Sequence, residues 1–352
     1  MSRGFISVGD ESLFCVTGCV MKYRFYVGKT VFEVNSFLPL PLKREDENFL
    51  PGAARQEGEV PEKGKELGVF AFGGRDVDLL FCCRVWIREG TVQEEESTPD
   101  FEDGSLAVWE SEVGSEIRTH RAMFAPGHPL FAGSESYPFT GSENEKDILS
   151  RGGSGCSSPK KTGRIEILYD TETGVWEDPN FSFWTLLHLE NCLLEAGGLI
   201  LHCCYLMYRG EAILFTAPSG TGKTTQGKLW ERVFGAEIIN GDKALLEQYG
   251  GRWNAWGYPF HGSAPECRNE RYPIRAVVVV AQAACDRVQP LNPAQAFILL
   301  FEGITVNAWN KERTGRAADL LQDLAAQVPV VRLECTMRES AAKVLHRYLY
   351  GE

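Results

Sequence analysis

Residues 217–224 read Ala217-Pro-Ser-Gly-Thr-Gly-Lys-Thr224, and an apolar run at residues 212–216 comes directly before them. The octapeptide is a Walker A pattern with Ala217 in place of the first glycine. The apolar run predicts a buried strand, and residues 224–234 are compatible with a helix, so the loop has the strand–loop–helix context that the pattern needs. The stretch therefore predicts a phosphate-binding loop in an α/β domain.

The residue types of this loop suit phosphate chemistry. Glycine adopts backbone conformations that other residues resist, so Gly220 and Gly222 allow successive N–H groups to form an anion nest. The helix that follows adds the positive end of its dipole. Lys223 can reach the β- and γ-phosphates of ATP, and the Thr224 hydroxyl can bind Mg²⁺. The predicted ATP-binding residues are Ser219, Gly220, Thr221, Gly222, Lys223, Thr224 and Thr225.

Strand and helix patterns alternate on both sides of the loop, which is typical of an α/β domain. Residues 199–216 predict a β-hairpin that turns at Arg209-Gly210. Further strands are predicted at residues 237–239, 274–280 and 329–333, and helices at residues 181–195, from Asn292-Pro293, and from a Thr336/Glu339 capping box to about Tyr350. The apolar residues 297–301 are interpreted as core. We therefore expect residues 179–352 to form an α/β domain.

The preceding part of the chain predicts a β-rich domain at residues 21–178, because short apolar runs alternate with Gly, Pro and charged clusters as in antiparallel sheets. The runs lie at residues 23–27, 31–34, 69–72, 77–87 and 165–169. Residues 43–67 and 133–163 are rich in Glu, Gly, Ser and Lys, which predicts solvated, flexible loops. Residues 1–20 are interpreted as an extension, so Met1 and Met21 are both open as the translation start.

Composition and charge exclude several classes of function. The 352 residues include 36 Lys and Arg against 48 Asp and Glu, so the formal net charge is −12. This acidic balance argues against nucleic-acid binding, and no apolar run reaches the roughly 18–20 residues of a membrane helix. None of the 11 cysteines forms a CxxC pair. We therefore predict reduced thiols, no zinc site and a cytoplasmic location.

Two further residues extend the loop pattern. His202 lies at the start of the predicted hairpin, and Asp242 lies in the segment Asn240-Gly-Asp-Lys243 after the strand at residues 237–239. A histidine on a hairpin, a Walker A loop and an aspartate after the next strand resemble the HPr kinase/phosphorylase family and its relatives of the phosphoenolpyruvate-carboxykinase type. The resemblance covers about residues 180–350. The chain is also similar to the free-standing HPr-kinase-like proteins that accompany peptide-modification genes in bacteria.

The resemblance implies an ATP- and Mg²⁺-dependent kinase that phosphorylates a Ser or Thr hydroxyl of a peptide or small protein, with a homo-oligomer open as its assembly. It implies catalytic roles for Asp242, as the general base, and for His202 and Lys223. Gly241 stands where the family usually has the first of two adjacent acids, and the family's metal-binding Glu in an Arg-Gly motif has no counterpart. Glu266 is the candidate to join Thr224 as a metal ligand.

Other interpretations stay open. Asp242 can be a turn residue after Gly241, and His202 can be a half-buried structural histidine. The chain can also be a nucleotide-binding regulatory protein without transfer chemistry, which needs the loop but not Asp242. A carboxykinase-like enzyme on a small carboxylic acid would need a Lys/His/Asp metal shell and a cluster of arginines, and the sequence offers no clear set of either.

Two more segments carry polar residues of interest. Residues 256–263 and 267–271 form a Gly- and Pro-containing stretch in which Arg268 or Arg271 could meet an anionic group of a substrate. An aromatic-packed surface loop is the alternative interpretation of that stretch. His120-Arg121 is interpreted as part of a solvated strand.

Overall fold

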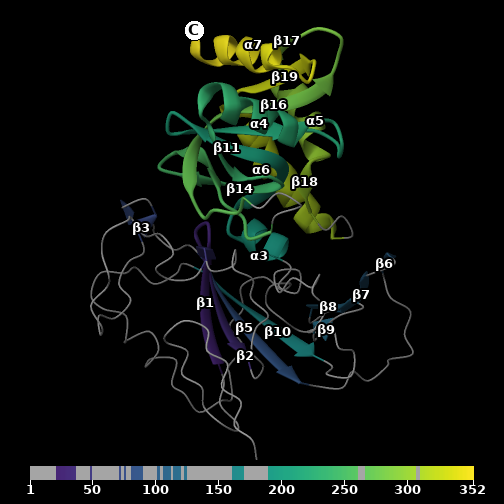
Figure 1. Ribbon diagram of the computed structural model, residues 1–352. Coiled ribbons are helices and arrows are strands. Elements are labelled where there is room, and N and C mark those ends of the chain that lie inside the picture. The colour runs from purple at the N-terminus through teal and green to yellow at the C-terminus, as the bar shows by residue number, and fades with distance from the viewer. Residues whose placement is uncertain are drawn as a thin grey trace, which may run out of the picture.

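The computed structural model describes residues 21–36, 48–49, 71–72, 75–76, 81–89, 101–103, 106–111, 114–119, 123–124, 161–169, 189–260, 266–306 and 310–352. These residues form an eight-stranded sheet in the N-terminal part, a nine-stranded sheet with helices in the C-terminal part, and a separate two-stranded pair. Figure 1 shows the helices gathered around the C-terminal sheet. The described chain is therefore a mixed α/β structure.

The N-terminal sheet has the strand order β1-β2-β5-β10-β9-β8-β7-β6. Its strands are β1 (Met21–Val27), β2 (Thr30–Ser36), β5 (Phe81–Glu89), β6 (Phe101–Asp103), β7 (Leu106–Ser111), β8 (Gly114–Thr119), β9 (Met123–Phe124) and β10 (Lys161–Tyr169), while β3 (Ala71–Phe72) and β4 (Arg75–Asp76) form the separate pair. β2 and β10 both run parallel to β5, so the antiparallel expectation is wrong for these strands. The long connections before and after β5 permit parallel pairing, which a tight hairpin does not.

The two predicted loops need correction where the structure describes them. Lys161, Thr162 and Gly163, at the end of the predicted 133–163 loop, belong to β10. Within the predicted 43–67 loop, Phe49 is fully buried. The rest of both loops, the extension at residues 1–20 and His120-Arg121 lie outside the described residues.

The C-terminal sheet has the order β12-β11-β14-β15-β16-β19-β17, with β13 and β18 also paired to β11 and β12 also paired to β16. Its strands are β11 (Gly198–Tyr208), β12 (Glu211–Thr216), β13 (Glu237–Asn240), β14 (Lys243–Tyr249), β15 (Arg252–Trp256), β16 (Arg271–Gln282), β17 (Arg287–Pro290), β18 (Ile304–Thr305) and β19 (Val330–Cys335). The predicted hairpin is confirmed, and it turns at Arg209 with φ 54°. β16 is parallel to both β12 and β19, as expected for an α/β sheet.

Five helices accompany this sheet: α3 (Leu189–Glu195), α4 (Lys223–Phe234), α5 (Pro293–Phe301), α6 (Lys311–Gln327) and α7 (Glu339–Tyr350). Side chains of α4 and α7 share one buried cluster with β12, β16 and β19. Side chains of α5 and α6 share a second cluster with β11, β14 and β15. The sheet is therefore covered by apolar helix faces on both sides, which satisfies its two buried surfaces.

Two predictions about these helices change in detail. α7 begins at Glu339 after Arg338, with no side-chain cap, so the Thr336/Glu339 capping box is wrong. Asp286 accepts hydrogen bonds from the N–H and the hydroxyl of Thr336. The Thr336 side chain is therefore bonded to Asp286 and does not cap α7. α5 supplies Leu300 to the core as expected, but Ile298 is 62% exposed, because the two residues lie on different sides of a helix.

The N-terminal sheet touches the C-terminal sheet at the turn between β1 and β2. The Lys29 N–H donates to Oε2 of the fully buried Glu247 at 3.0 Å, and the Lys29 ammonium donates to the Gln248 carbonyl at 2.9 Å. The Asn269 side chain donates to the Tyr26 carbonyl at 3.0 Å. Gly28 has φ +58°, a conformation that favours glycine, and a Cβ on it would lie 2.5 Å from the Leu245 side chain on β14. Glycine at this position therefore allows the β1–β2 turn to approach β14 closely.

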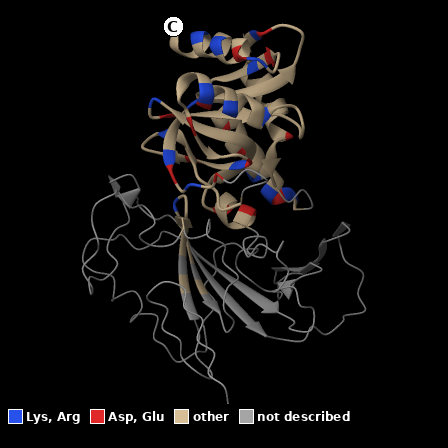
Figure 2. Ribbon diagram, in the orientation of Figure 1, with Lys and Arg blue, Asp and Glu red and all other residues tan. Residues whose placement is uncertain are grey.

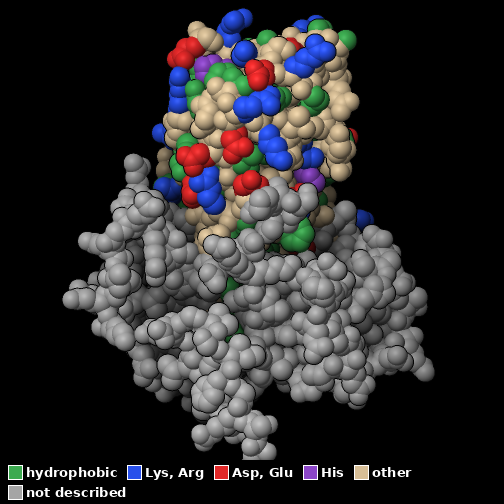
Figure 3. Space-filling view, in the orientation of Figure 1, with side chains coloured by type: hydrophobic (Ala, Val, Ile, Leu, Met, Phe, Trp, Pro, Cys, Tyr) green, Lys and Arg blue, Asp and Glu red, His purple; other side chains and the backbone are tan. Residues whose placement is uncertain are grey.

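One further finding concerns the length of the helices, and another concerns the charges on the surface. In the described part of the chain, no helix combines the length and the apolar character that crossing a membrane requires. Figures 2 and 3 show Lys and Arg mixed with Asp and Glu over the visible face of the C-terminal region, rather than gathered by sign.

Candidate active site

The Walker A residues form a loop between β12 and α4, as the sequence predicts. Gly220 and Gly222 have φ values of 77° and 115°, the conformations for which glycine is needed. Among the described residues, no acceptor takes a hydrogen bond from the N–H groups of Ser219, Gly220 or Gly222. These exposed or half-buried donors are available to an anion, so the loop fits the phosphates of a nucleotide.

Lys223, the first residue of α4, is held at the mouth of the loop. Its side chain is 7% exposed, and its ammonium donates to the carbonyls of Ala217 at 2.8 Å and Pro218 at 3.4 Å. Burial lowers the pKa of Lys223, and the nearby Cys203 and Asp242 oppose this effect. The ammonium is therefore close to the loop, where it can exchange carbonyl partners for phosphate oxygens.

The packing of α4 explains how the loop is fixed against the sheet. Gly227 lies in the middle of α4, where glycine costs helix stability. A Cβ at this position would lie 2.5 Å from the Cys204 sulfur on β11. Gly227 thus allows α4 to approach β11 closely, which places the start of the helix beside the strand that carries His202.

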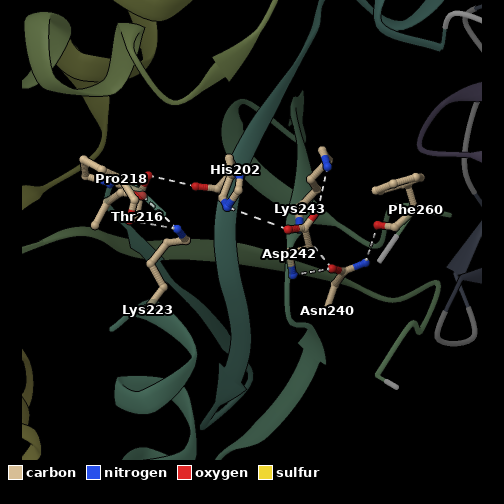
Figure 4. A network of polar contacts seen from close by, with 9 residues as sticks. His202, Thr216, Pro218, Lys223, Asn240, Asp242, Lys243 and Phe260 are labelled. Carbon is tan, nitrogen blue, oxygen red and sulfur yellow. Dashed lines mark hydrogen bonds and ion pairs between the residues drawn. The ribbon is translucent and has the colours of Figure 1, made fainter. Parts of the chain in front are cut away.

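His202 lies on β11 next to the end of the loop strand. The Thr216 hydroxyl donates to the His202 carbonyl at 2.9 Å, and the His202 N–H donates to the Gly303 carbonyl at 2.8 Å. The imidazole Nε2 lies 3.7 Å from Oδ1 of Asp242, and its side chain is 39% exposed. The backbone of His202 is therefore fixed, and its ring lies beside Asp242 (Figure 4).

Asp242 lies in the turn between β13 and β14. Its Oδ2 accepts a hydrogen bond from the Lys243 ammonium at 2.5 Å, and its own backbone carbonyl accepts from the Cys203 N–H at 2.9 Å. The Lys243 ammonium also lies 4.3 Å from the centre of the Phe260 ring. Asp242 therefore has one oxygen paired with Lys243 and the other directed toward His202 (Figure 4).

The charges around His202 compete. Burial and the positive charge of Lys223 lower its pKa below the ordinary value, Asp242 raises it, and Lys243 lowers it again. The net effect is a lowered pKa, so the imidazole is neutral at neutral pH. A neutral imidazole can accept a hydrogen bond, which a protonated one cannot.

The order of the strands corrects one expectation. From the sequence we expect the strand before Asp242 to lie next to the loop strand β12. In the structure β11 lies between β12 and β13, because β11 uses both of its edges. As a result His202 stands between Lys223 and Asp242, and Figure 4 shows Lys223 and Asp242 on either side of the strand that carries His202.

The predicted metal ligands Thr224 and Glu266 are both half-buried. Glu266 lies directly before Cys267, which forms a β-bridge with Asn240. Burial and then the charge of Glu266 raise the pKa of Cys204 to about 12, so Glu266 lies near the part of β11 that packs on α4. No group of three or more His, Cys, Asp or Glu side chains within the described ranges could hold a metal ion by itself. Mg²⁺ often takes one or two protein ligands and completes its shell with phosphates and water, and the assignment of Thr224 and Glu266 as those ligands stays a prediction.

In the predicted substrate loop, Arg268 and Arg271 both have partners within the protein. Arg268 is paired with Glu237 at 2.8 Å and Glu270 at 3.3 Å. The Arg271 guanidinium lies over the Tyr249 ring, 3.8 Å from its centre. Both arginines therefore stabilise the protein itself. Tyr258 and Phe260 nevertheless belong to the site through their backbone carbonyls, while residues 261–265 lie outside the described ranges.

Sequence reasoning missed Asn240 and Lys243. Asn240 is fully buried at the end of β13, and its Oδ1 accepts from the N–H groups of Asp242 at 2.8 Å and Lys243 at 2.9 Å. The signal was present, because an Asn-Gly pair after a strand favours such a side-chain turn. The role of Lys243 had no sequence signal, since it depends on the distant Phe260 ring.

The comparisons with known proteins give little beyond this geometry. No protein-family model and no curated protein matches the chain. Among solved structures, the chain is similar to the HPr(Ser) kinase/phosphatase from Coxiella burnetii, with 10% sequence identity and a TM-score of 0.26, over 43% of this chain and 93% of that chain. A likeness of this size does not identify a function, so the functional conclusion rests on the side chains described above.

Proposed function

We propose that the chain is an ATP-dependent phosphotransferase that moves the γ-phosphate of ATP to a Ser or Thr hydroxyl of a peptide or small protein. The observation that carries the proposal is the meeting of three side chains around β11, with His202 between Lys223 and Asp242. A phosphate cradle alone would support nucleotide binding. A carboxylate beside that cradle supplies the additional group that transfer to a hydroxyl needs.

The loop and Lys223 would hold the phosphates of ATP. The loop N–H groups that have no acceptor among the described residues, and the start of α4, favour negative charge. Mg²⁺, when bound, neutralises part of the phosphate charge, and Thr224 and Glu266 are the side chains that would hold it. Phosphoryl transfer needs little covalent help from the protein, so this binding and alignment provide most of the catalysis.

Asp242 would act on the acceptor. The acceptor oxygen forms a bond to the γ-phosphorus, the bond from that phosphorus to the β–γ bridging oxygen breaks, and ADP leaves. The acceptor proton moves to the Asp242 carboxylate, whose Oδ1 lies 3.7 Å from His202 Nε2. Before this transfer, His202, neutral because of its lowered pKa, can accept the single hydrogen bond that the hydroxyl donates and so orient it, and the proton then moves from this position to Asp242.

The openness of the site favours a large acceptor. Pro218, Ser219 and Gly220 are exposed, and the His202 side chain is 39% exposed. A hydroxyl on a peptide or a protein surface can therefore approach the loop and His202 from solvent, and the Asp242 side chain, which is 19% exposed, lies beside His202. A closed, water-free pocket is the more common arrangement for a small acceptor.

The test is incubation with γ-labelled ATP, Mg²⁺ and the peptides and small proteins encoded by neighbouring genes, followed by mass spectrometry of the labelled product. We expect label on a Ser or Thr. Asp242→Asn should reduce transfer by about 10²–10⁴-fold, because the basic oxygen is lost, and should leave ATP affinity within a few-fold. Asp319→Asn, at an exposed position of α6, is the matched control.

The outcomes separate the candidates. A wild-type rate in Asp242→Asn would contradict the role of Asp242 as the base and favour a turn residue. Tight ATP binding without transfer to any tested acceptor, and without hydrolysis, would favour a regulatory nucleotide-binding protein.

A further inference from the structure

Asn240 has four hydrogen bonds from one fully buried side chain. Its Oδ1 accepts from the N–H groups of Asp242 at 2.8 Å and Lys243 at 2.9 Å. Its Nδ2 donates to the carbonyls of Tyr258 at 2.9 Å and Phe260 at 3.2 Å. A carboxamide has two acceptor positions and two N–H donors, so every one of them is used.

The oxygen of Asn240 fixes the backbone from which the Asp242 carboxylate projects. The Asp242 N–H is bonded to Asn240, and the Asp242 carbonyl is bonded to the Cys203 N–H at 2.9 Å. With both sides of the residue held, the carboxylate has little freedom except rotation of its own side chain. Asn240 therefore limits where Asp242 can lie relative to His202.

The nitrogen of Asn240 fixes the neighbouring segment Tyr258–Phe260. By binding the Phe260 carbonyl it holds the residue whose ring lies under the Lys243 ammonium. Lys243 in turn is paired with Oδ2 of Asp242. The buried amide of Asn240 thus holds the backbone of Asp242 and of Lys243, and also the Phe260 residue that contacts Lys243 (Figure 4).

We propose that Asn240 is a positioning residue that holds the Asp242 carboxylate toward His202 and ties it to the Tyr258–Phe260 segment on the acceptor side. The catalytic consequence rests on the proposed function, because it assumes that Asp242 serves as the base. The geometric part does not, since the orientation of Asp242 can be measured without turnover.

Asn254 provides a matched comparison. It is also buried, at 4% exposed, and its Nδ2 also donates to two carbonyls, those of Tyr249 at 3.1 Å and Arg252 at 2.9 Å. It contacts none of the site residues through these bonds. Replacing either asparagine by alanine removes buried hydrogen bonds and lowers stability, but only Asn240→Ala should disturb the site.

The first measurement is the pKa of His202, followed by NMR of its imidazole and assigned with His202→Gln. The charges that act on this imidazole come from Lys223, Asp242 and Lys243, and the effect of Asp242 outweighs that of Lys243. Asp242→Asn should lower the pKa of His202 because an adjacent negative charge is lost. Asn240→Ala should shift the pKa in the same direction, and the double variant should add little to Asp242→Asn. Asn254→Ala should leave it at the wild-type value.

The second measurement is ATP turnover with water as the acceptor. Asn240→Ala should lower kcat by about tenfold or more, with ATP affinity unchanged within a few-fold, because the loop and Lys223 are not touched. The loss should nearly vanish when Asp242 is already Asn, as for two groups that act through one interaction. Asn254→Ala should lower stability without changing kcat.

Asn240→Ser keeps one short acceptor oxygen, so it should fold even where Asn240→Ala does not, and should shift the pKa of His202 less in the same direction. An unchanged or raised pKa in whichever variant folds contradicts the proposal. If Asp242→Asn retains wild-type turnover while Asn240→Ala still shifts the pKa of His202, the proposed function fails and the positioning role stands.

Discussion

Two histidines at opposite ends of the β11–β12 hairpin have opposite surroundings. His202, near the phosphate-binding loop, has a side chain that is 39% exposed and has Lys223, Asp242 and Lys243 as charged neighbours. His346 is 6% exposed and stacks on Phe234 with ring centres 4.2 Å apart and an interplanar angle of 14°. The residue type is the same, so the neighbours decide that one ring serves the site and the other serves packing.

The difference extends to the backbone. At the His346 end, Tyr208 at the hairpin turn contacts the rings of Trp230 and Tyr350, and its hydroxyl lies 3.2 Å from His346 Nε2. At the His202 end, the loop N–H groups of Ser219, Gly220 and Gly222 have no acceptor among the described residues. A hairpin fixed by aromatic packing at one end can present unsatisfied donors at the other without losing its position.

Of the changes at the polar end of the hairpin, removal of the Lys223 charge should have the largest effect on ATP binding and turnover. Lys223→Ala should weaken ATP–Mg²⁺ binding by about ten- to a hundredfold and lower turnover by a further ~10²–10³-fold, because the phosphates lose their main cationic partner. Calorimetric titration with ATP–Mg²⁺ and a turnover assay check both. Lys228→Ala, at an exposed position of the same helix, is the control. Equal ATP affinity in wild type and Lys223→Ala would contradict the assignment of the loop.

Glu247 offers a third kind of surrounding, because it is a buried acid with a single charged neighbour. Burial raises its pKa to about 7, opposed by the charge and the N–H group of Lys29. Its Oε1 has no hydrogen-bond partner among the described residues. The charged residues at the site have two or more partners each, so their ionisation is compensated, whereas that of Glu247 is only partly compensated.

The raised pKa of Glu247 predicts a sign for the dependence of stability on pH. Its contribution is fully present below the ordinary pKa of about 4.5 and is lost as pH rises through about 7. Glu247→Gln, which stays neutral, should match the wild type at pH 4.5 and exceed it above pH 7, by at most about 3 kcal/mol in the free energy of unfolding. Urea titrations across this range check it. A wild type that is more stable than the variant at pH 8 would show that Lys29 compensates the buried charge.

The sequence predicted those parts of the site that depend on local spacing. The Walker A loop and the hairpin follow from glycines, a lysine and a turn at fixed positions, and each is found where predicted. Asp242 and His202 were named from the family resemblance rather than from spacing, and they lie 3.7 Å apart. Residues a few positions from one structural element can be located from sequence, because short connections leave few alternatives.

The rest depends on contacts between distant segments. The place of β11 between β12 and β13 is a matter of strand order, which no local pattern encodes. The Thr336/Glu339 spacing favoured a helix cap, but Thr336 donates its hydrogen bonds to the distant Asp286 instead. α6 was not predicted, although Ala317, Leu321 and Leu324 lie on one buried face at helical spacing. The polar residues between them hid that periodicity.

The most direct test of the two histidines replaces each by glutamine, which keeps hydrogen-bonding groups but cannot be protonated. His202→Gln should lower turnover by about tenfold, because a hydroxyl-orienting acceptor is moved, and should leave the free energy of unfolding nearly unchanged at this half-exposed position. His346→Gln should leave turnover unchanged and cost about 1–3 kcal/mol, because a stacked buried ring is lost.

The pH profile of turnover sharpens this comparison. Burial and Lys223 lower the pKa of His202, so its neutral form persists to a pH below the ordinary histidine range, and wild-type turnover should fall only as pH drops through that lowered pKa. His202→Gln should lose this part of the acidic limb, whereas His346→Gln should keep it. Turnover and urea midpoints are measured for both variants across the same pH series. If His346→Gln altered the acidic limb and His202→Gln did not, the aromatic end of the hairpin would be the functional one and the roles of the two histidines would be reversed.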